Sequence, residues 1–159
     1  MSTQPITDYL TAIAHLADGG VLRLEQISWD VYEDLLNHLG DRPGYRVSYN
    51  RGRLEIMSPL PEHEEFKEMF LLFARIVAEE LGILLETRGS ATYKQKRQSQ
   101  GVEPDTSFYV QNATAMIGKR PIDLELDPPP DVVVEIDIPT ASSSKFPIYA
   151  SIGMPEIWG

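Results

Sequence analysis

Two acidic residues and one lysine lie where they could hold a metal ion and assist a hydrolysis. Asp105 follows a proline at the start of a β-patterned run, Glu135 follows three valines further along the chain, and Lys145 comes shortly afterwards. Two carboxylates on neighbouring strands can hold a divalent ion, which polarises a phosphate oxygen and lowers the pKa of bound water. An ammonium group orients that water or offsets the charge that builds on the phosphate. These residue types indicate phosphodiester hydrolysis, although their spacing alone is common in proteins.

The strand that carries Glu135 is the clearest signal in the chain. It runs from Pro130 to Asp137, and its three valines favour a strand that is buried on both faces. Because side chains alternate along a strand, Glu135 and Asp137 share one face, opposite Val134 and Ile136. Acids on such a strand need compensation, so we expect either a metal site or structural ion pairs. The basic residues available for such pairs are Arg88, Lys96 and Lys145.

The absence of cysteine limits the kinds of metal site that the chain can form. Only carboxylate, histidine, carbonyl and water ligands remain, and these favour hard ions such as Mg²⁺ or Mn²⁺. The 159 residues suffice for one domain with a core, and we expect a single domain over residues 1–159. There is no membrane-spanning apolar run and no signal peptide. We therefore expect a cytoplasmic protein without a membrane partner.

The charge balance argues against bulk electrostatic binding of nucleic acid. The net charge is −10 and the sequence pI is about 4.7, whereas proteins that bind nucleic acid usually show a basic footprint. One dense basic cluster consists of Arg88, Lys94, Lys96 and Arg97. It is either a local contact for nucleic acid or a solvated strand edge, where lysine is common.

The strongest helical pattern covers residues 62–81, with Pro61 at its first position and Gly82 as its stop. His63 falls near the apolar face of this helix. It is therefore predicted to point inward, either into a site or as a hydrogen-bonded core histidine. Glu64 falls nearly opposite that face and belongs to an acidic first turn, which suits the helix dipole.

A β-hairpin is predicted from two short runs, residues 45–49 and 53–57, which are joined by a turn with glycine at residues 50–52. Glu55 lies on the face opposite Leu54, and burial statistics favour a glutamate that faces solvent there.

The rest of the chain alternates short helices and strands. Ser28 is the expected N-cap of one helix. The last strand begins only a few residues before the chain stops, so we expect a C-terminally truncated domain. The predicted helices cover residues 6–18, 29–39, 113–117 and 145–152, and the predicted strands cover residues 21–27, 83–87, 91–97, 105–110 and 155–158.

Several short stretches, spread over about residues 20–159, together match one known family. They are residues 45–49, 52–59, 63–64, 103–105, 108–109, 132–136, 148–149 and 153–158. In this order and spacing the sequence resembles the Uma-two family, a group of restriction-endonuclease-like proteins that is abundant in cyanobacteria and is assigned to the PD-(D/E)xK nuclease superfamily. The resemblance implies an α/β (α+β) fold, with a central mixed β-sheet flanked by helices. It also implies an N-terminal helical segment over about residues 1–40 and a nuclease core over about residues 41–159.

The resemblance also implies roles for individual residues. Asp105 matches the aspartate of the family's Pro-Asp motif, and Glu135 matches the acid of the second half-motif. Both would bind Mg²⁺ (or Mn²⁺), and the backbone carbonyl of Ile136 would complete the metal shell. Lys145 matches a lysine that lies four residues before a tyrosine, here Tyr149. His63 matches a histidine that would point into the site.

The resulting expectation is a metal-dependent endonuclease that hydrolyses DNA and forms a homodimer. Glu55 and Glu64 match further acids of the family and are weaker candidates. Asp137 occupies the position where the superfamily usually has lysine, so it is either an extra metal ligand or the mark of a weakened enzyme. The alternative expectation is a catalytically weak or inactive member that serves as a binding or dimerisation module.

Overall fold

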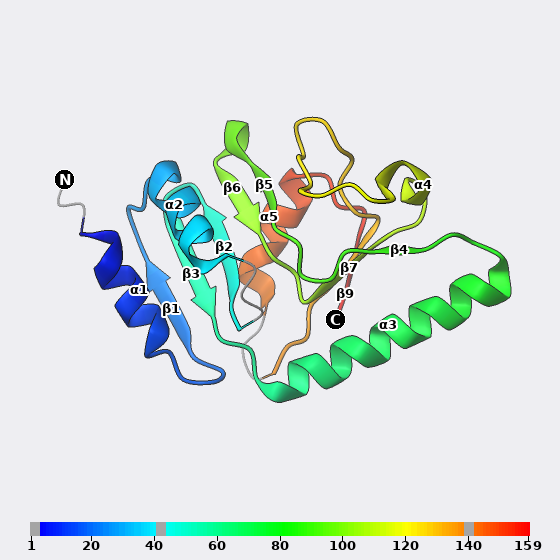
Figure 1. Cartoon of the computed structure of the whole chain (residues 1–159), viewed down its shortest axis with the longest axis horizontal. Coiled ribbons are helices and arrows are strands. Elements are labelled where there is room, and N and C mark those ends of the chain that lie inside the picture. The colour runs from blue at the N-terminus through cyan, green and yellow to red at the C-terminus, as the bar shows by residue number, and fades with distance from the viewer. Residues whose placement is uncertain (1–3, 41–43, 139–141) are drawn as a thin grey trace.

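The computed structural model describes residues 4–40, 44–138 and 142–159. Within these ranges helices and strands form a mixed α+β fold with two sheets (Figure 1), which confirms the predicted fold class. The helices are α1 (Ile6–Ala14), α2 (Trp29–Leu39), α3 (Pro61–Leu81), α4 (Ala113–Met116) and α5 (Phe146–Ser151), with 3₁₀ turns η1 (Lys96–Gln98) and η2 (Ser142–Lys145). The strands are β1 (Val21–Leu24), β2 (Arg46–Asn50), β3 (Arg53–Met57), β4 (Glu86–Thr87), β5 (Tyr93–Gln95), β6 (Gln100–Val102), β7 (Thr106–Tyr109), β8 (Val132–Val134) and β9 (Glu156–Trp158).

The first sheet contains five antiparallel strands in the order β1-β3-β2-β6-β5. Strands β2 and β3 form the predicted hairpin. At its turn Gly52 has a φ of 95°, a conformation that glycine adopts without steric cost. Leu54 and Ile56 are fully buried in a core with Tyr32 and Leu35 of α2. Helices α1 and α2 therefore cover one face of this sheet.

The second sheet has the order β4-β7-β8-β9 and is mixed, because β8 and β9 are parallel while the other pairs are antiparallel. Its central strand β8 is the predicted valine strand, and it is buried on both faces. Val132 and Val134 pack in one cluster with Ala74 of α3, whereas Val133 packs in another with Tyr149 of α5. Because side chains alternate along the chain, the residue after Val134 points to the same side as Val133, toward α5.

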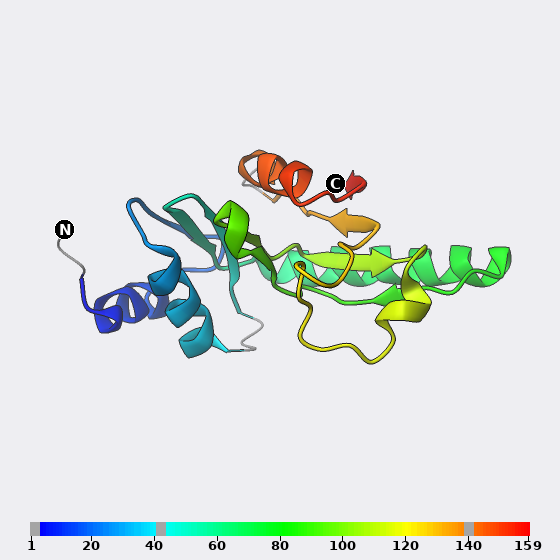
Figure 2. The same cartoon turned by 90° about the horizontal axis from the view of Figure 1, so that it is seen from above.

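The helices lie on both sides of the strands. Figure 2 shows α1 and α2 on one side of the molecule and α5 on the other, with the strands between them. Helix α5 packs against the first sheet through Tyr93 and Val102 and against the second through Val133. It therefore joins the two sheets, whereas a single central sheet was expected.

Local signals set the helix ends that the sequence predicted. The Ser28 side chain accepts a hydrogen bond from the Val31 N–H at 3.3 Å at the start of α2. Gly82 adopts a left-handed conformation with a φ of 63° at the end of α3, as a helix C-cap requires. Strand β8 is shorter than predicted and ends at Val134.

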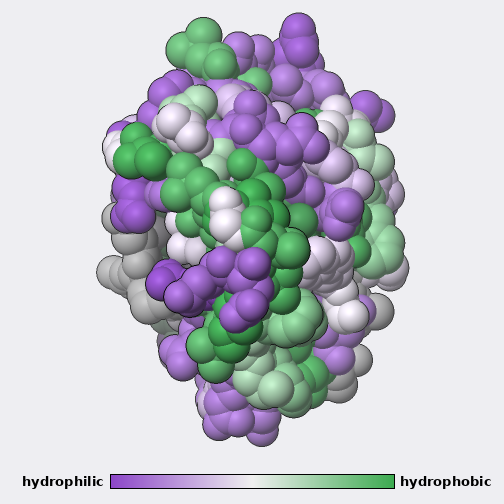
Figure 3. Space-filling model, turned by 90° about the vertical axis from the view of Figure 1, so that its right-hand side faces the viewer, coloured by the Kyte–Doolittle hydropathy of each residue, from purple (hydrophilic) through white to green (hydrophobic). Residues whose placement is uncertain are grey.

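Helix α3 differs from the prediction in how much of its apolar side is covered. Its buried residues are His63, Ala74 and Ala78. Seven large apolar side chains are more than a third exposed, and we call them the α3 apolar face: Phe66, Met69, Leu72, Phe73, Ile76, Val77 and Leu81. Figure 3, which looks onto the end of the molecule where α3 stops, shows apolar side chains gathered in the middle of the surface. Periodicity identifies an apolar face but does not say what covers it.

Candidate functional site

Asp105 and Glu135 lie side by side on neighbouring strands of the second sheet. Strands β7 and β8 are antiparallel with Thr106 opposite Val134, so the next position along the ladder brings Asp105 opposite Glu135. The Asp105 N–H donates to the Val134 carbonyl at 3.1 Å, which extends the pairing to this position. Opposite residues of an antiparallel pair have Cβ atoms about 5 Å apart. The sheet register therefore places the two carboxylates together.

Glu135 points toward α5, as the alternation along β8 requires, and it is only 2% exposed. Its Oε2 accepts a charged hydrogen bond from Lys145 Nζ at 2.8 Å. Its Oε1 accepts a hydrogen bond from the Tyr149 hydroxyl. Lys145 is also buried, so the ion pair lies away from water, where charges interact strongly.

The electrostatics of Glu135 reflect this environment. Burial raises the pKa of Glu135, Lys145 opposes the rise, and the negative charge of Asp105 adds to it. Burial also raises the pKa of Tyr149, and Glu135 acts in the same direction. Tyr149 therefore remains a proton donor to the carboxylate throughout the physiological pH range.

Asp105 is 1% exposed and uses its two oxygens differently. Oδ2 accepts a hydrogen bond from the Ile136 N–H at 2.8 Å. Oδ1 lies 3.4 Å from Nε of Arg46 in an ion pair, yet it has no hydrogen-bond partner within the described ranges. A buried polar atom without a hydrogen bond is costly. Oδ1 is therefore a favourable position for an additional ligand.

His63 approaches Asp105 from the first turn of α3. Its Nδ1 lies 3.6 Å from Asp105 Oδ2, and its Nε2 lies 2.9 Å from the carbonyl oxygen of Ile138. Because a carbonyl only accepts hydrogen bonds, Nε2 donates and carries a proton. His63 is 1% exposed, so the sequence-based expectation that it points inward matches its position. Its catalytic role stays a prediction.

Arg46 links the buried acids to the protein surface. It lies on β2, its side chain is 2% exposed, and its Nη2 meets Glu64 Oε1 at 3.2 Å. Glu64 also pairs with Lys67 one helical turn further along α3. Partial burial would raise the pKa of Glu64, but the contacts with Lys67 and Arg46 lower it. Glu64, which is half exposed, therefore lies at the outer edge of the site.

Glu103 is a third acid close to the site, two residues before Asp105. Its Oε2 accepts a hydrogen bond from the Val47 N–H at 2.9 Å, and its Oε1 accepts one from the Thr92 hydroxyl at 2.6 Å. Burial raises the pKa of Glu103, and these two hydrogen bonds oppose the rise. The carbonyl oxygen of Glu103 lies 3.5 Å from Lys145 Nζ. The residue therefore connects the buried lysine to β2 and to the start of β5, the two neighbours of β6 in the first sheet.

The other predicted site residues are placed differently. Glu55 pairs with Arg23 of β1 at 2.8 Å, and none of its hydrogen bonds in the described part of the chain reaches Asp105 or Glu135. Asp137 is exposed, because β8 ends before it and the alternation no longer holds it beside Glu135. Ile136 touches the site through its N–H, and the metal-binding role of its carbonyl stays a prediction.

Two residues of this site, Arg46 and Glu103, received no role from the sequence alone. Both are charged residues within or beside β-patterned runs, which is the same kind of signal that singled out Glu135. The sequence pattern does not fix which face of a strand meets a neighbouring sheet. For that reason the sequence could not predict that Arg46 contacts Asp105 and that Glu103 contacts Lys145.

The donor set fits a hydrated divalent ion better than an ion enclosed by protein ligands. In residues 4–40, 44–138 and 142–159, no group of three or more His, Asp or Glu side chains is arranged to hold a metal ion. Mg²⁺ is commonly bound by one or two carboxylates while it keeps several waters. Asp105 Oδ1, which accepts no hydrogen bond from the described residues, and one oxygen of Glu135 would suffice. Glu135 would exchange its contact with Lys145 or Tyr149 for the ion.

The basic cluster predicted from the sequence does not form one strip. Arg88 is buried in an ion pair, with its side chain 4% exposed. Lys94 pairs with Glu33 of α2 at 2.8 Å. Lys96 and Arg97 are exposed on η1. These two residues alone remain as a solvent-facing basic pair within the cluster.

The fold and the buried group of two acids and a lysine are consistent with the restriction-endonuclease-like class of proteins. A family model described as "Putative restriction endonuclease" (Uma2) matches residues 29–159, and the chain belongs to this family. The match confirms the resemblance found in the sequence. No match was found among curated proteins. Across the described ranges, every helix is too short or too polar to cross a membrane.

Proposed function

We propose that this protein is a metal-dependent endonuclease that hydrolyses the phosphodiester bonds of DNA. The buried group of Asp105, Glu135 and Lys145 in a member of a nuclease-like family supports this proposal. Asp105 and Glu135 would hold Mg²⁺ (or Mn²⁺). When bound, such an ion polarises a phosphate oxygen and lowers the pKa of water.

The side chains around the carboxylates would orient them and stabilise the reacting phosphate. The Lys145 ammonium lies 2.8 Å from Glu135, so it would remain close enough to offset negative charge on a phosphate when Glu135 turns one oxygen to the ion. Tyr149 holds the other oxygen of Glu135. Arg46 and His63 hold Asp105 from two further elements. Such preorganisation is what a hydrolytic site requires.

The charge balance of the site favours phosphate binding despite the acidic chain. The formal charges around the site are four negative and three positive, carried by Asp105, Glu135, Glu103 and Glu64 and by Arg46, Lys145 and Lys67. A divalent ion would turn this deficit of one charge into an excess of one positive charge in a region of low dielectric. That excess would attract a phosphodiester locally, although the chain carries a net charge of −10.

The test is cleavage of supercoiled plasmid DNA in the presence of Mg²⁺ or Mn²⁺. We expect conversion to the nicked and linear forms, and loss of this activity by at least about a hundredfold when Glu135→Gln or Asp105→Asn removes a carboxylate charge. Calorimetric titration with Mn²⁺ should show one site in the parent protein and none in either variant.

Glu55→Gln is the matched control, because it changes another strand glutamate that pairs with Arg23 outside the site. It should leave both cleavage and Mn²⁺ binding unchanged. If Glu135→Gln and Asp105→Asn cleave as well as the parent, the proposed nuclease site is wrong. If they lower only the stability, the two acids are structural ion-pair partners instead.

The exposed α3 apolar face favours a second candidate function, the formation of a homodimer. Contiguous exposed apolar surface usually marks an interaction site, and the commonest symmetric contact places the same surface of two copies together. Phe73 is 59% exposed in the middle of this face.

Sedimentation velocity tests this dimer. The parent should dimerise at micromolar concentration, and Phe73→Gln should shift it to monomer. Arg75→Gln is the control, because at about 100° per residue Arg75 lies on the opposite side of α3. A parent that stays monomeric, or an Arg75→Gln variant that dissociates equally, would contradict the dimer without affecting the nuclease proposal.

A further inference from the structure

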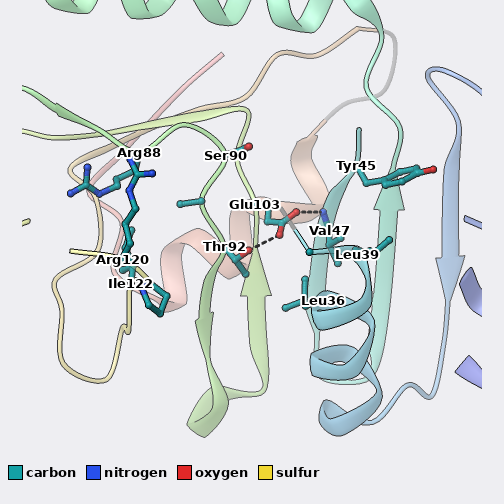
Figure 4. A pocket seen from close by; sticks show the side chains of 13 residues that line it. Leu36, Leu39, Tyr45, Val47, Arg88, Ser90, Thr92, Glu103, Arg120 and Ile122 are labelled. Carbon is teal, nitrogen blue, oxygen red and sulfur yellow. Dashed lines mark hydrogen bonds between the residues drawn. The ribbon is translucent and has the colours of Figure 1, made fainter. Parts of the chain in front are cut away.

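A large pocket lies between the first sheet and the segment that follows α4, separate from the catalytic carboxylates (Figure 4). Its volume is about 720 Å³. Pockets for small organic ligands typically measure about 300–1,000 Å³. The residues that line this pocket and matter below are Leu36, Leu39, Arg88, Thr92, Glu103 and Arg120.

The two ends of the pocket differ in chemistry. Figure 4 shows Arg88 and Arg120 together on one side and Leu36 and Leu39 of α2 on the other, with Glu103 between them. A ligand that fills the pocket therefore meets two guanidinium groups at one end and aliphatic side chains at the other. This combination suits a molecule with an anionic group and a flat, mainly apolar body.

Arg88 is prepared to bind an anion. Its side chain is 4% exposed and is held by Glu86 and by the carbonyls of Thr87 and Met116. Its Nε is buried and has no hydrogen-bond partner in the part of the chain that the structure describes. Because Glu86 already pairs with this guanidinium, Arg88 contributes its unused Nε donor, which a small rotation of the side chain would turn toward a phosphate oxygen. Arg120 is exposed and lies on the same side of the pocket (Figure 4), where it supplies a second guanidinium group.

Glu103 provides an acceptor between the two ends. Each of its oxygens already accepts one hydrogen bond, from Val47 and from Thr92, and each carboxylate oxygen can accept a second. Acceptor groups of this kind bind the N–H groups of nucleic-acid bases. Glu103 thus adds a polar contact for a base that packs on the aliphatic wall.

The pocket is connected to the catalytic group through the same residue. The Glu103 carbonyl lies 3.5 Å from Lys145 Nζ, and Asp105 follows two residues later, a span of about 7 Å in an extended chain. Successive nucleotides of one strand rise by about 3.4 Å along a duplex. A nucleotide in the pocket therefore lies within a few nucleotide steps of the proposed metal ligands.

We propose that this pocket binds one nucleotide unit, with its phosphate at Arg88 and Arg120 and its base between Glu103 and the leucines of α2. The proposal deepens and rests on the proposed nuclease function, since it adds a position at which one nucleotide of the substrate is held out of its stack. The same chemistry would also accept a free nucleoside monophosphate.

The test is calorimetric titration of the protein with adenosine monophosphate in the presence of a chelator. One molecule should bind per chain, and adenosine, which lacks the phosphate, should bind at least about tenfold more weakly. Arg120→Gln should also weaken binding of adenosine monophosphate by about tenfold. Because Arg120 is exposed, this substitution should not disturb folding.

Arg75→Gln is the matched control, because it removes the same charge from exposed surface on α3, away from the pocket. It should leave binding unchanged. The proposal is overturned if adenosine monophosphate does not bind, if adenosine binds equally well, or if Arg75→Gln weakens binding as much as Arg120→Gln.

A competition experiment distinguishes the two sources of the nucleotide. Displacement of adenosine monophosphate by a single-stranded oligonucleotide in the parent, with weaker displacement in Arg120→Gln, assigns the pocket to the nucleic-acid strand. Absence of displacement assigns it to a free nucleotide. These measurements need no metal and no cleavage, so nucleotide binding without nuclease activity would reject only the proposed function, and cleavage without nucleotide binding would reject only this pocket.

Discussion

The buried ion pair of Lys145 and Glu135 is the feature on which the proposed chemistry depends most directly. Both residues were selected from the sequence, because a charge directly after an apolar strand needs compensation. Their contact at 2.8 Å also depends on how α5 is placed against β8. Sequence spacing does not provide that information, and the same limit explains why Arg46 and Glu103 were assigned no role.

Glu135→Gln should lower the free energy of unfolding by about 3 kcal/mol, because it leaves the Lys145 charge buried without its anionic partner. The double variant Glu135→Gln/Lys145→Met removes both charges, so it should be closer in stability to the parent than Glu135→Gln alone. Urea denaturation in the presence of a chelator provides the measurement. Strictly additive effects of the two substitutions would show that the pair is not coupled.

Elements with strong local signals were predicted more accurately than elements that depend on pairing. The cap at Ser28 and the stop at Gly82 fixed α2 and α3. Gln100 and Gly101 fell outside the predicted strands, but they belong to β6, which lies between β2 and β5 in the first sheet. Its identity as a strand depends on these neighbours, which are remote in the sequence.

Gly101→Ala should lower the free energy of unfolding by about 1–3 kcal/mol through overpacking. A Cβ atom at this position of β6 would lie 2.8 Å from Cζ of Tyr32. Tyr32 cannot move away easily, because its ring stacks on the ring of Tyr49 in the core of the first sheet, with the ring centroids 4.6 Å apart. Thermal and urea denaturation should both show the loss.

Gly44→Ala serves as the control for this substitution. An added Cβ atom at Gly44 meets no atom of the described residues within 4 Å, so the change should leave stability unchanged or raise it slightly by restricting the unfolded chain. An equal decrease in the free energy of unfolding for Gly101→Ala and Gly44→Ala would contradict a steric role for Gly101.

At the scale of the whole molecule, composition predicted the fold class but not the arrangement of the strands in two sheets. The length, the mixed pattern of helices and strands, and the absence of cysteine restricted the chain to a single mixed fold with oxygen and nitrogen ligands. The division of the strands into two sheets joined by α5 depends on contacts between segments far apart in the chain. The exposure of the α3 apolar face likewise follows from the whole fold and not from the helix itself.

Four of the seven tyrosines should resist ionisation until the protein unfolds. Burial raises the pKa of Tyr32, Tyr93 and Tyr149 well above the usual value, and it raises the pKa of Tyr109 to about 12. Because these hydroxyls ionise more readily in the unfolded chain, stability should fall as the pH rises above about 10. Tyrosinate absorbance recorded together with circular dichroism provides the measurement. Ionisation of all seven tyrosines near pH 10 with an unchanged dichroism spectrum would contradict it.

The short connection between Val102 of β6 and Thr106 of β7 carries one further consequence. Its three residues pass from one sheet to the other and contribute the Glu103 side chain to the pocket and the Asp105 side chain to the proposed catalytic group. One added residue would shift the register and turn every following side chain to the other face of its strand. Over evolutionary time, relatives that share this activity should therefore keep the length of this connection constant.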